Sequence, residues 1–330
     1  MNYIGSKQSL LPFLEQTIDN VTSNAREGVF ADLFAGTGAV GAAFRRKGYS
    51  VLANDIQHYS FVLNRHFVEN PSSLTASHLD FFNALDGTDG FVYNNYCAGS
   101  GSNRNYFTDE NGRRCDAMRS AIEELFVNEK IGIDEYYYYL ASLVNSIDKV
   151  ANTASVYGAY LKHIKKSAEK TLKLELLPII DGPRGKAYNE DINSLIRTVS
   201  GDVLYLDPPY NARQYSSNYH VLETISRYDA PTLTGMTGLR DSKAQKSAFC
   251  SKRTVAQAFD DIIANADFKY VFLSYNNEGL MNLDTIREIM SRYGKYEQFT
   301  QEYRRFRADK PDARNHKADA TLEYLHVCVK

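Results

Sequence analysis

The stretch LYLDPPYN, residues 204–211, places an acid, two prolines and a tyrosine directly after a short apolar run. Neither Pro208 nor Pro209 has a backbone N–H, so the stretch cannot continue the hydrogen bonds of a sheet. Pro209 also holds Pro208 in an extended conformation, which fixes the direction of the Pro208 carbonyl. These residues predict a rigid corner at the end of a strand, with that carbonyl and the Asp207 carboxylate as fixed hydrogen-bond acceptors.

Two fixed acceptors match the two protons of an exocyclic amine on a nucleobase. Such an amine is a poor nucleophile because its lone pair is delocalised into the ring. Preorganised acceptors can draw the nitrogen toward tetrahedral geometry, so that it takes up a methyl group. The Tyr210 ring can stack on the base, a contact worth about 1–3 kcal/mol in nucleic-acid binders. In a duplex the amine is paired, so the base must be flipped out. By itself, an Asp-Pro-Pro sequence could equally be a capped turn.

A second group of residues lies in DLFAGTGAVG, residues 32–41, where Gly36 and Gly38 predict a tight turn from a strand into a helix. Asp55 ends the next apolar run, where an acid can accept hydrogen bonds from ribose hydroxyls. The glycine pattern is not GxGxxG, which favours S-adenosylmethionine over a dinucleotide. Asp32 suits the positive charges of that sulfonium compound. Both acids could instead be caps at strand ends.

The segment NYIGSK, residues 2–7, precedes a stretch with helical periodicity over residues 10–18. A helix N-terminus with a serine and a lysine beside it is a natural site for a carboxylate. The segment could therefore hold the methionine carboxylate of the same cofactor, or it could be an ordinary capped helix that faces solvent.

The elements that must position these residues predict an α/β fold. Residues 29–34, 39–47 and 49–53 read as strand, helix and strand, the beginning of a parallel, Rossmann-like sheet. Further strands are expected within 202–210, 269–279 and 322–330, with a short strand and helix within 186–196 and a helix over 282–294.

Residues 61–170 predict a mostly helical region inserted into a discontinuous catalytic domain formed by residues 1–60 and 171–330. Within the insertion, residues 116–126 and 134–164 show helical periodicity, the second with a break near 151–153. Asn111 and Gly112 predict a tight hairpin turn.

Composition limits the class of protein. The 330 residues are 43% hydrophobic, which excludes a disordered chain, and the net charge of -2 excludes a protein that is basic throughout. No apolar run is long enough to span a bilayer. The four cysteines form no CxxC pair, which predicts free thiols, a cytoplasmic location and no metal site.

Taken together, NYIGSK, DLFAGTGAVG, ANDI, YNEDI and LYLDPPYN resemble, in content and order, the Dam-like class of DNA adenine-N6 methyltransferases. DKVANTASVYGAYLK and DPPYNARQYSSNYHVLETI resemble the subgroup found in restriction–modification systems. The resemblance implies a Rossmann-like methyltransferase that uses S-adenosylmethionine and acts on double-stranded DNA. It also implies that the insertion recognises the target and that a cognate restriction endonuclease is a further partner.

The resemblance implies that Tyr3, Lys7, Asp55 and Asp207 contact S-adenosylmethionine and that Asp191 lies near its adenine. The motifs add the other residues expected in the cofactor pocket, which are Gly5, Ser6, Asp32, Phe34, Gly36, Gly38 and Ile56. The target base is expected to be held by Asp207, Pro208, Pro209 and Tyr210.

Contact with DNA is expected from local basic clusters, because lysines and arginines near phosphates supply most non-specific affinity. The clusters lie in the insertion, at residues 240–253 and at residues 292–317, the last with eight Lys/Arg and four Asp/Glu. The residues expected at the DNA are Arg104, Arg113, Arg114, Arg240, Lys243, Lys252, Arg253, Arg304, Arg305 and Arg307.

Two alternatives remain open. Asp-Pro-Pro-Tyr also occurs in methyltransferases that act on guanine amines of ribosomal RNA, although NYIGSK and the large insertion argue against that substrate. The other alternative is a DNA-binding protein that has kept the fold and lost catalysis, and the intact residues 207–210 argue against it.

Overall fold

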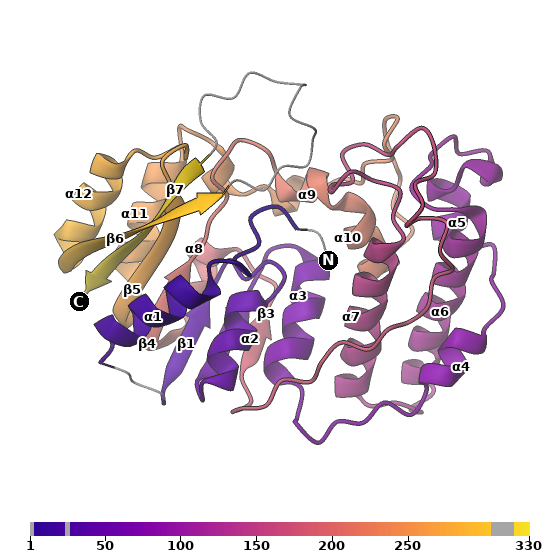
Figure 1. The fold of residues 1–330 in the computed structure, drawn as a ribbon, viewed down its shortest axis with the longest axis horizontal. Helices are drawn as coiled ribbons and strands as arrows, with labels where there is room; N and C mark the ends of the chain where they lie inside the picture. Colours follow the sequence, from indigo (N-terminus) through magenta and orange to yellow (C-terminus); the bar gives the residue numbers. More distant parts are fainter. Residues whose placement is uncertain (1–2, 24–26, 305–319) are drawn as a thin grey trace.

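The computed structural model describes residues 3–23, 27–304 and 320–330 (Figure 1). Within these ranges the strands form a seven-stranded sheet in the order β3-β2-β1-β4-β5-β7-β6. The strands are β1 (Val29–Asp32), β2 (Ser50–Asn54), β3 (Lys186–Tyr188), β4 (Ser200–Leu206), β5 (Asp267–Asn276), β6 (Lys295–Arg304) and β7 (Ala320–Val329).

Parallel pairing sets the position of the site. β1 pairs in parallel with β2 on one side and with β4 on the other, so that Ala31 lies opposite both Leu52 and Leu204. β3 and β5 extend the parallel part, and β7 runs antiparallel between β5 and β6. The predicted α/β, Rossmann-like fold is confirmed. The carboxyl ends of β1, β2 and β4 consequently meet at one edge of the sheet.

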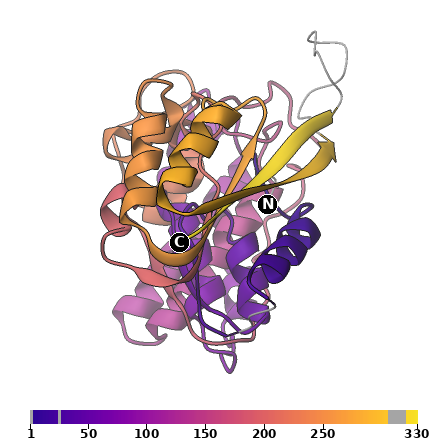
Figure 2. The same cartoon turned by 90° about the vertical axis from the view of Figure 1, so that its left-hand side faces the viewer.

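Helices cover both faces of the sheet, because alternate residues of the central strands are buried on opposite sides. Val203 and Tyr205 of β4 pack into a core with α1 (Leu11–Val21) and α2 (Ala39–Arg46). Leu204 and Leu206 pack into another core with α8 (Ile192–Leu195), α11 (Val255–Asn265) and α12 (Leu283–Tyr293). Figure 2 shows β6 and β7 between α1 on one side and α11 and α12 on the other.

The α-helices of the described residues are α1 (Leu11–Val21), α2 (Ala39–Arg46), α3 (His58–Asn64), α4 (Leu79–Ala84), α5 (Phe91–Tyr96), α6 (Asp109–Val127), α7 (Ile133–Lys149), α8 (Ile192–Leu195), α9 (Tyr215–Asn218), α10 (His220–Arg227), α11 (Val255–Asn265) and α12 (Leu283–Tyr293). Shorter helical turns are η1 (Arg65–Glu69), η2 (Ala98–Ser100), η3 (Lys243–Gln245) and η4 (Ala248–Cys250). No helix among the described residues is long and apolar enough to cross a membrane.

The inserted region lies beside the sheet, with α4 to α7 grouped on the right in Figure 1. Its core contains Met118 of α6 and Leu143 of α7, and it also contains Leu222 and Ile225 of α10. Since α10 follows the proline corner in the chain, the insertion shares its core with a segment assigned to the catalytic part. The domain boundaries at residues 60 and 171 therefore remain a prediction.

Two predictions about the insertion need correction. Asn111 and Gly112 do not form a hairpin turn but lie in the first turns of α6, where the Thr108 side chain accepts a hydrogen bond from the Asn111 amide at 3.2 Å. This N-cap and the acids in the first turn, Asp109 and Glu110, outweigh the local turn preference. The helix expected over 134–164 ends at Lys149, close to the predicted break. The strand β6 was not predicted.

Asn111 joins α6 to the segment that leads out of the insertion. Its side-chain amide donates to Ala168 O at 3.2 Å and Lys170 O at 2.9 Å, and its carbonyl accepts from Leu172 N at 2.7 Å. We expect Asn111→Ala to lower the free energy of unfolding by about 2–4 kcal/mol, since each buried partner left unpaired costs about 1–3 kcal/mol. Urea titration measures this change. Glu124→Ala on the exposed face of α6 is the control, and equal stability of the two variants would contradict the prediction.

Candidate active site

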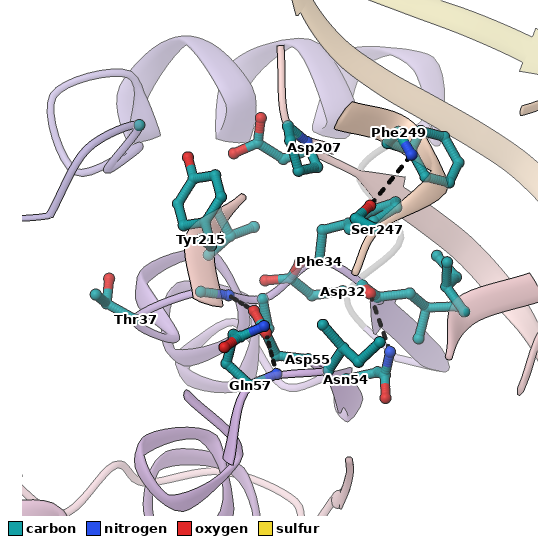
Figure 3. Close-up of a pocket in the computed structure, with 18 of the residues that line it drawn as sticks. Asp32, Phe34, Thr37, Asn54, Asp55, Gln57, Asp207, Tyr215, Ser247 and Phe249 are labelled. Carbon is teal, nitrogen blue, oxygen red and sulfur yellow. Dashed lines mark hydrogen bonds between the residues drawn. The ribbon is translucent and has the colours of Figure 1, made fainter. Parts of the chain in front are cut away.

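A pocket of about 950 Å³, part of it open to solvent, lies where β1, β2 and β4 end. Figure 3 shows Asp32, Asp55, Asp207 and Tyr215 arranged around it. The predicted residues that line the pocket are Tyr3, Gly5, Ser6, Lys7, Asp32, Phe34, Gly36, Asp55, Ile56, Asp191, Asp207 and Pro209. The predicted residues outside its lining are Gly38, Pro208 and Tyr210. One pocket therefore unites the N-terminal segment, the glycine turn and the proline corner.

The glycine turn between β1 and α2 is fixed by Asp55. The Asp55 carboxylate accepts hydrogen bonds from Gly36 N at 3.0 Å and from Gln57 N at 2.8 Å. Gly36 has a φ of +51°, and a β-carbon there would lie 3.0 Å from Tyr3 Cε1, so this position needs glycine. Burial raises the pKa of Asp55 to about 6, although the two amides oppose the shift. The carboxylate is thus ionised at neutral pH and faces the pocket.

Asp32 differs from Asp55 because no described group donates a hydrogen bond of normal geometry to its carboxylate. Its side chain is 1% exposed, and neither carboxylate oxygen has a hydrogen-bond partner among the described residues. Burial, reinforced by the negative charge of Asp207, raises the pKa of Asp32 to about 8, while the nearby Gly41 amide partly opposes the shift. Because an unpaired buried carboxylate is costly, Asp32 is mostly protonated at neutral pH, and nearby positive charge would favour its ionised form. Its position in the pocket wall therefore fits a ligand that brings positive charge.

The proline corner is held by a buried network around Lys7. The Lys7 ammonium lies 2.8 Å from Asp207 Oδ1 and 3.6 Å from Glu323 Oε1. The Tyr210 hydroxyl lies 2.8 Å from Asp207 Oδ1 and 2.6 Å from Glu323 Oε1, which also accepts from Ser274 Oγ at 2.9 Å. The network connects the N-terminal segment, the corner, β5 and β7. Glu323 and Ser274 were not predicted, because they lie in other strands far along the chain.

Charge compensation within this network sets its protonation. Burial and the Glu323 charge raise the pKa of Asp207, and Lys7 opposes that shift. Burial alone would lower the pKa of Lys7, but the two carboxylates outweigh it and raise that pKa. Lys7 therefore stays protonated and supports the ionised form of Asp207.

Tyr210 is packed rather than free. Its ring contacts Tyr275 edge to face at 4.9 Å, and the Lys7 ammonium lies 4.9 Å from its centroid. Stacking of Tyr210 on a target base remains a prediction.

Tyr3 is held by aromatic residues that the sequence did not single out. Its ring stacks on Tyr219 at 4.8 Å, and the Tyr219 hydroxyl accepts from Ile4 N at 2.8 Å. The Tyr215 hydroxyl donates to Ile4 O at 3.2 Å. The segment between the proline corner and α10 thereby fixes the N-terminal wall of the pocket.

The opposite wall comes from a segment that the sequence suggested only as a basic loop. Phe249 packs edge to face on Phe34 at 5.0 Å, and the Ser247 amide donates to Gln214 Oε1 at 2.9 Å. Gln245, Ser247 and Phe249 all line the pocket. Exposed Lys246 lies between Gln245 and Ser247, but exposed Lys243 breaks any regular alternation, so the spacing in this segment carries no clear signal.

The arginines expected at DNA have partners within the protein. Arg104 donates to three backbone carbonyls, those of Asn95, Gly235 and Met236, and Arg114 donates to those of Asn83, Leu85 and Leu172. Arg113 pairs with Asp89, and Arg240 pairs with Asp229 through its two terminal nitrogens, Nη1 and Nη2. These four residues make contacts within the protein in this structure, and their contact with DNA stays a prediction.

The remaining residues expected at DNA fall into two groups. Lys243, Lys252 and Arg253 are exposed. Arg304 ends β6, its side chain lies outside the described residues, and Arg305 and Arg307 lie outside them entirely.

Comparison with known proteins agrees with this geometry. Residues 3–289 match the sequence model of the D12 class N6 adenine-specific DNA methyltransferases. The chain belongs to this family, and the resemblance stated from the motifs is confirmed. It is an enzyme that methylates adenine in DNA.

Several curated proteins are similar over most of the chain. The chain is 51% identical to the type II methyltransferase M.NlaIII of Neisseria lactamica, over 100% of this chain and 99% of that protein. It is 39% identical to the type II methyltransferase M.FokI of Planomicrobium okeanokoites, over all of this chain but 53% of that protein. It is 36% identical to M.CviAII of Paramecium bursaria Chlorella virus 1, over 93% of each. No solved structure matches the chain.

The charge balance around Lys7 can be tested by its removal. We expect Lys7→Met to lower the free energy of unfolding by about 3–5 kcal/mol at pH 8, because it leaves buried carboxylates without a cation. The deficit should shrink as the pH falls, since protonation of carboxyl groups with raised pKa values removes the uncompensated charge. Urea titrations from pH 5 to pH 9 measure this dependence.

Lys243→Met is the control, because the Lys243 side chain is 86% exposed. A Lys7→Met deficit that is the same at every pH would mean that Lys7 does not compensate Asp207 and Glu323.

Proposed function

We propose that this protein is the modification enzyme of a type II restriction–modification system, that it uses S-adenosylmethionine, and that its reaction takes place in the pocket described above. The observation that carries the proposal is the shared pocket. A buried acid without a partner, Asp32, lies in the same pocket as a corner whose acceptors suit an adenine amine, at Asp207.

The residues of the pocket fit the cofactor. The unpartnered Asp32 carboxyl suits its positive charges, and the Asp55 carboxylate, fixed by two backbone amides, suits ribose hydroxyls. Ser6 and Asp191 line the same pocket, as expected for the carboxylate and adenine ends. S-adenosylmethionine supplies the methyl group when it is bound.

The proline corner is assigned to the target adenine. Lys7 and Tyr210 both contact Asp207 Oδ1, so Oδ2 is the oxygen that can accept a hydrogen bond from the amine. The Pro208 carbonyl is the second acceptor, and both act on a base that has left the duplex. Asp207, with its raised pKa, is also suited to take up the proton that the amine loses.

The cellular context follows from the relatives. M.NlaIII and M.CviAII carry type II methyltransferase names and match almost the full chain. We accordingly propose that a cognate restriction endonuclease exists and that the protein acts in the cytoplasm. The free cysteines of the described structure, all buried, are compatible with a reducing compartment.

The experiment that tests the function is transfer of labelled methyl from S-adenosylmethionine to unmethylated genomic DNA and, separately, to total RNA, followed by mapping of the modified bases. Label on adenine at one short recurring sequence supports the proposal and gives the target. Label on RNA alone would instead support a guanine-modifying enzyme. Bound cofactor without transfer to either would support a silent DNA-binding relative.

The proline corner is tested with Asp207→Ala. We expect the rate of methyl transfer to fall by about 100-fold or more, since loss of one preorganised group of this kind costs about 10²–10³ in rate. Single-turnover transfer measures the rate, and calorimetry measures the affinity for S-adenosylmethionine. Near-normal transfer in this variant would remove Asp207 from the mechanism.

The cofactor assignment is tested with Asp55→Asn. We expect the affinity for S-adenosylmethionine to fall about 10- to 100-fold, because hydrogen bonds to charged groups contribute about 1.5–3 kcal/mol. The wild-type affinity should also fall as the pH drops through about 6, where Asp55 becomes protonated. Asp202→Asn is the control, because Asp202 lies at the other end of β4 and accepts from Val29 N. Equal affinity of Asp55→Asn and wild type for S-adenosylmethionine would mean that Asp55 only caps the glycine turn and does not bind the cofactor.

A further inference from the structure

The loop that follows α10 contains a tight turn with an exposed apolar tip. Thr234 and Leu239 exchange two backbone hydrogen bonds, of 2.8 and 2.9 Å, around residues 235–238. Gly235 and Gly238 have φ values of +70° and +69°, which the turn requires. Between them, Met236 is 82% exposed, more than any other large hydrophobic side chain of the described residues.

This turn is unusually well fixed for a surface loop. Arg104 donates to the carbonyls of Gly235 and Met236, at 3.2 Å each. The Thr237 carbonyl lies 3.1 Å from the Tyr106 hydroxyl and 2.8 Å from His220 Nε2, and the Tyr96 hydroxyl donates to Gly238 O at 3.4 Å. Four consecutive carbonyls are therefore bound by side chains from the insertion and from α10.

A chain of contacts links the turn to the wall of the pocket. Tyr3 lines the pocket and stacks on Tyr219, which immediately precedes His220, and His220 contacts the turn at Thr237. In Figure 1 the loop after α10 rises at the upper edge of the molecule, between α10 and α5. The turn that carries Met236 is thus linked through His220 and its neighbour Tyr219 to Tyr3 in the pocket wall.

The segment that follows the turn, residues 240–253, carries exposed positive charge on both sides of the part that lines the pocket. Its exposed cations are Lys243, Lys246, Lys252 and Arg253. Its residues in the pocket wall are Gln245, Ser247 and Phe249. A duplex whose target adenine enters the pocket would meet these cations with its phosphates.

We propose that Met236 inserts between base pairs of the bound duplex and supports the extrusion of the target adenine. Apolar side chains, methionine among them, act as such wedges in proteins that unstack DNA. A fixed backbone suits this task, because a mobile loop would lose conformational entropy when it enters the stack. The inference rests on the DNA substrate of the enzyme and goes beyond it by naming the residue that opens the helix.

The test compares two duplexes with the target sequence that methylation mapping gives. One is fully paired, and the other has an abasic site opposite the target adenine, so that this adenine has no partner to lose. We expect Met236→Ala to lower kcat/KM roughly tenfold on the paired duplex and less than about twofold on the abasic duplex. When 2-aminopurine replaces the target adenine, its fluorescence in the complex reports how far the base is extruded. This fluorescence should be lower with Met236→Ala than with wild type on the paired duplex only.

Two variants complete the design. Met236→Leu keeps an apolar tip and should stay within about twofold of wild type. Val127→Ala removes another exposed apolar side chain, 68% exposed at the end of α6, and should leave kcat/KM unchanged on both duplexes. Met236→Ala activity equal to wild type on the paired duplex would overturn the proposal, as would an equal loss on both duplexes. Absence of DNA methylation by the wild-type enzyme would instead refute the proposed function, before any variant is made.

Discussion

Parallel pairing of β1 with β2 and β4 brings Asp32, Asp55 and Asp207 to one buried edge of the sheet. Burial disfavours the ionised form of each carboxyl group, and their mutual repulsion adds to this cost. The rest of the site follows from how this negative charge is compensated. A parallel sheet gives these side chains a common edge but no counter-charge, which must come from elsewhere in the chain.

The three acids differ in how far the protein compensates them. Asp55 receives backbone amides, which keep its carboxylate fixed beside the glycine turn. Asp207 receives Lys7 from the N-terminal segment, together with the Tyr210 hydroxyl. Neither carboxylate oxygen of Asp32 accepts a hydrogen bond from the described chain. Asp55 and Asp207 are thus held in place by the protein, whereas the cost of ionising Asp32 is left uncompensated.

The inserted region is packed against the segment that follows the proline corner. Its core includes residues of α10, and its Arg104, Tyr96 and Tyr106 hold the loop that follows α10. Arginines in the insertion therefore connect segments of the protein, and the exposed charge beside the pocket comes from residues 243–253. Glu323 extends the same logic, because it lies in β7, beyond residues 3–289 that match the family, and still contacts the proline corner.

The sequence by itself determined the contiguous parts of this protein. The glycine turn, the proline corner and the parallel strands around them could be predicted because each depends on local properties, namely glycine at positive φ, proline without an N–H, and runs of buried apolar residues. Tertiary structure decided what these parts touch. Glu323, Ser274 and Phe249 reach the site only because distant strands and loops pack there. The helix at Asn111 formed against its local turn preference, because Thr108 caps it and the segment at residues 168–172 binds the side-chain amide. Arg104 became a structural clamp because backbone carbonyls that need donors lie beside it, and such long-range pairing has no local pattern in the sequence.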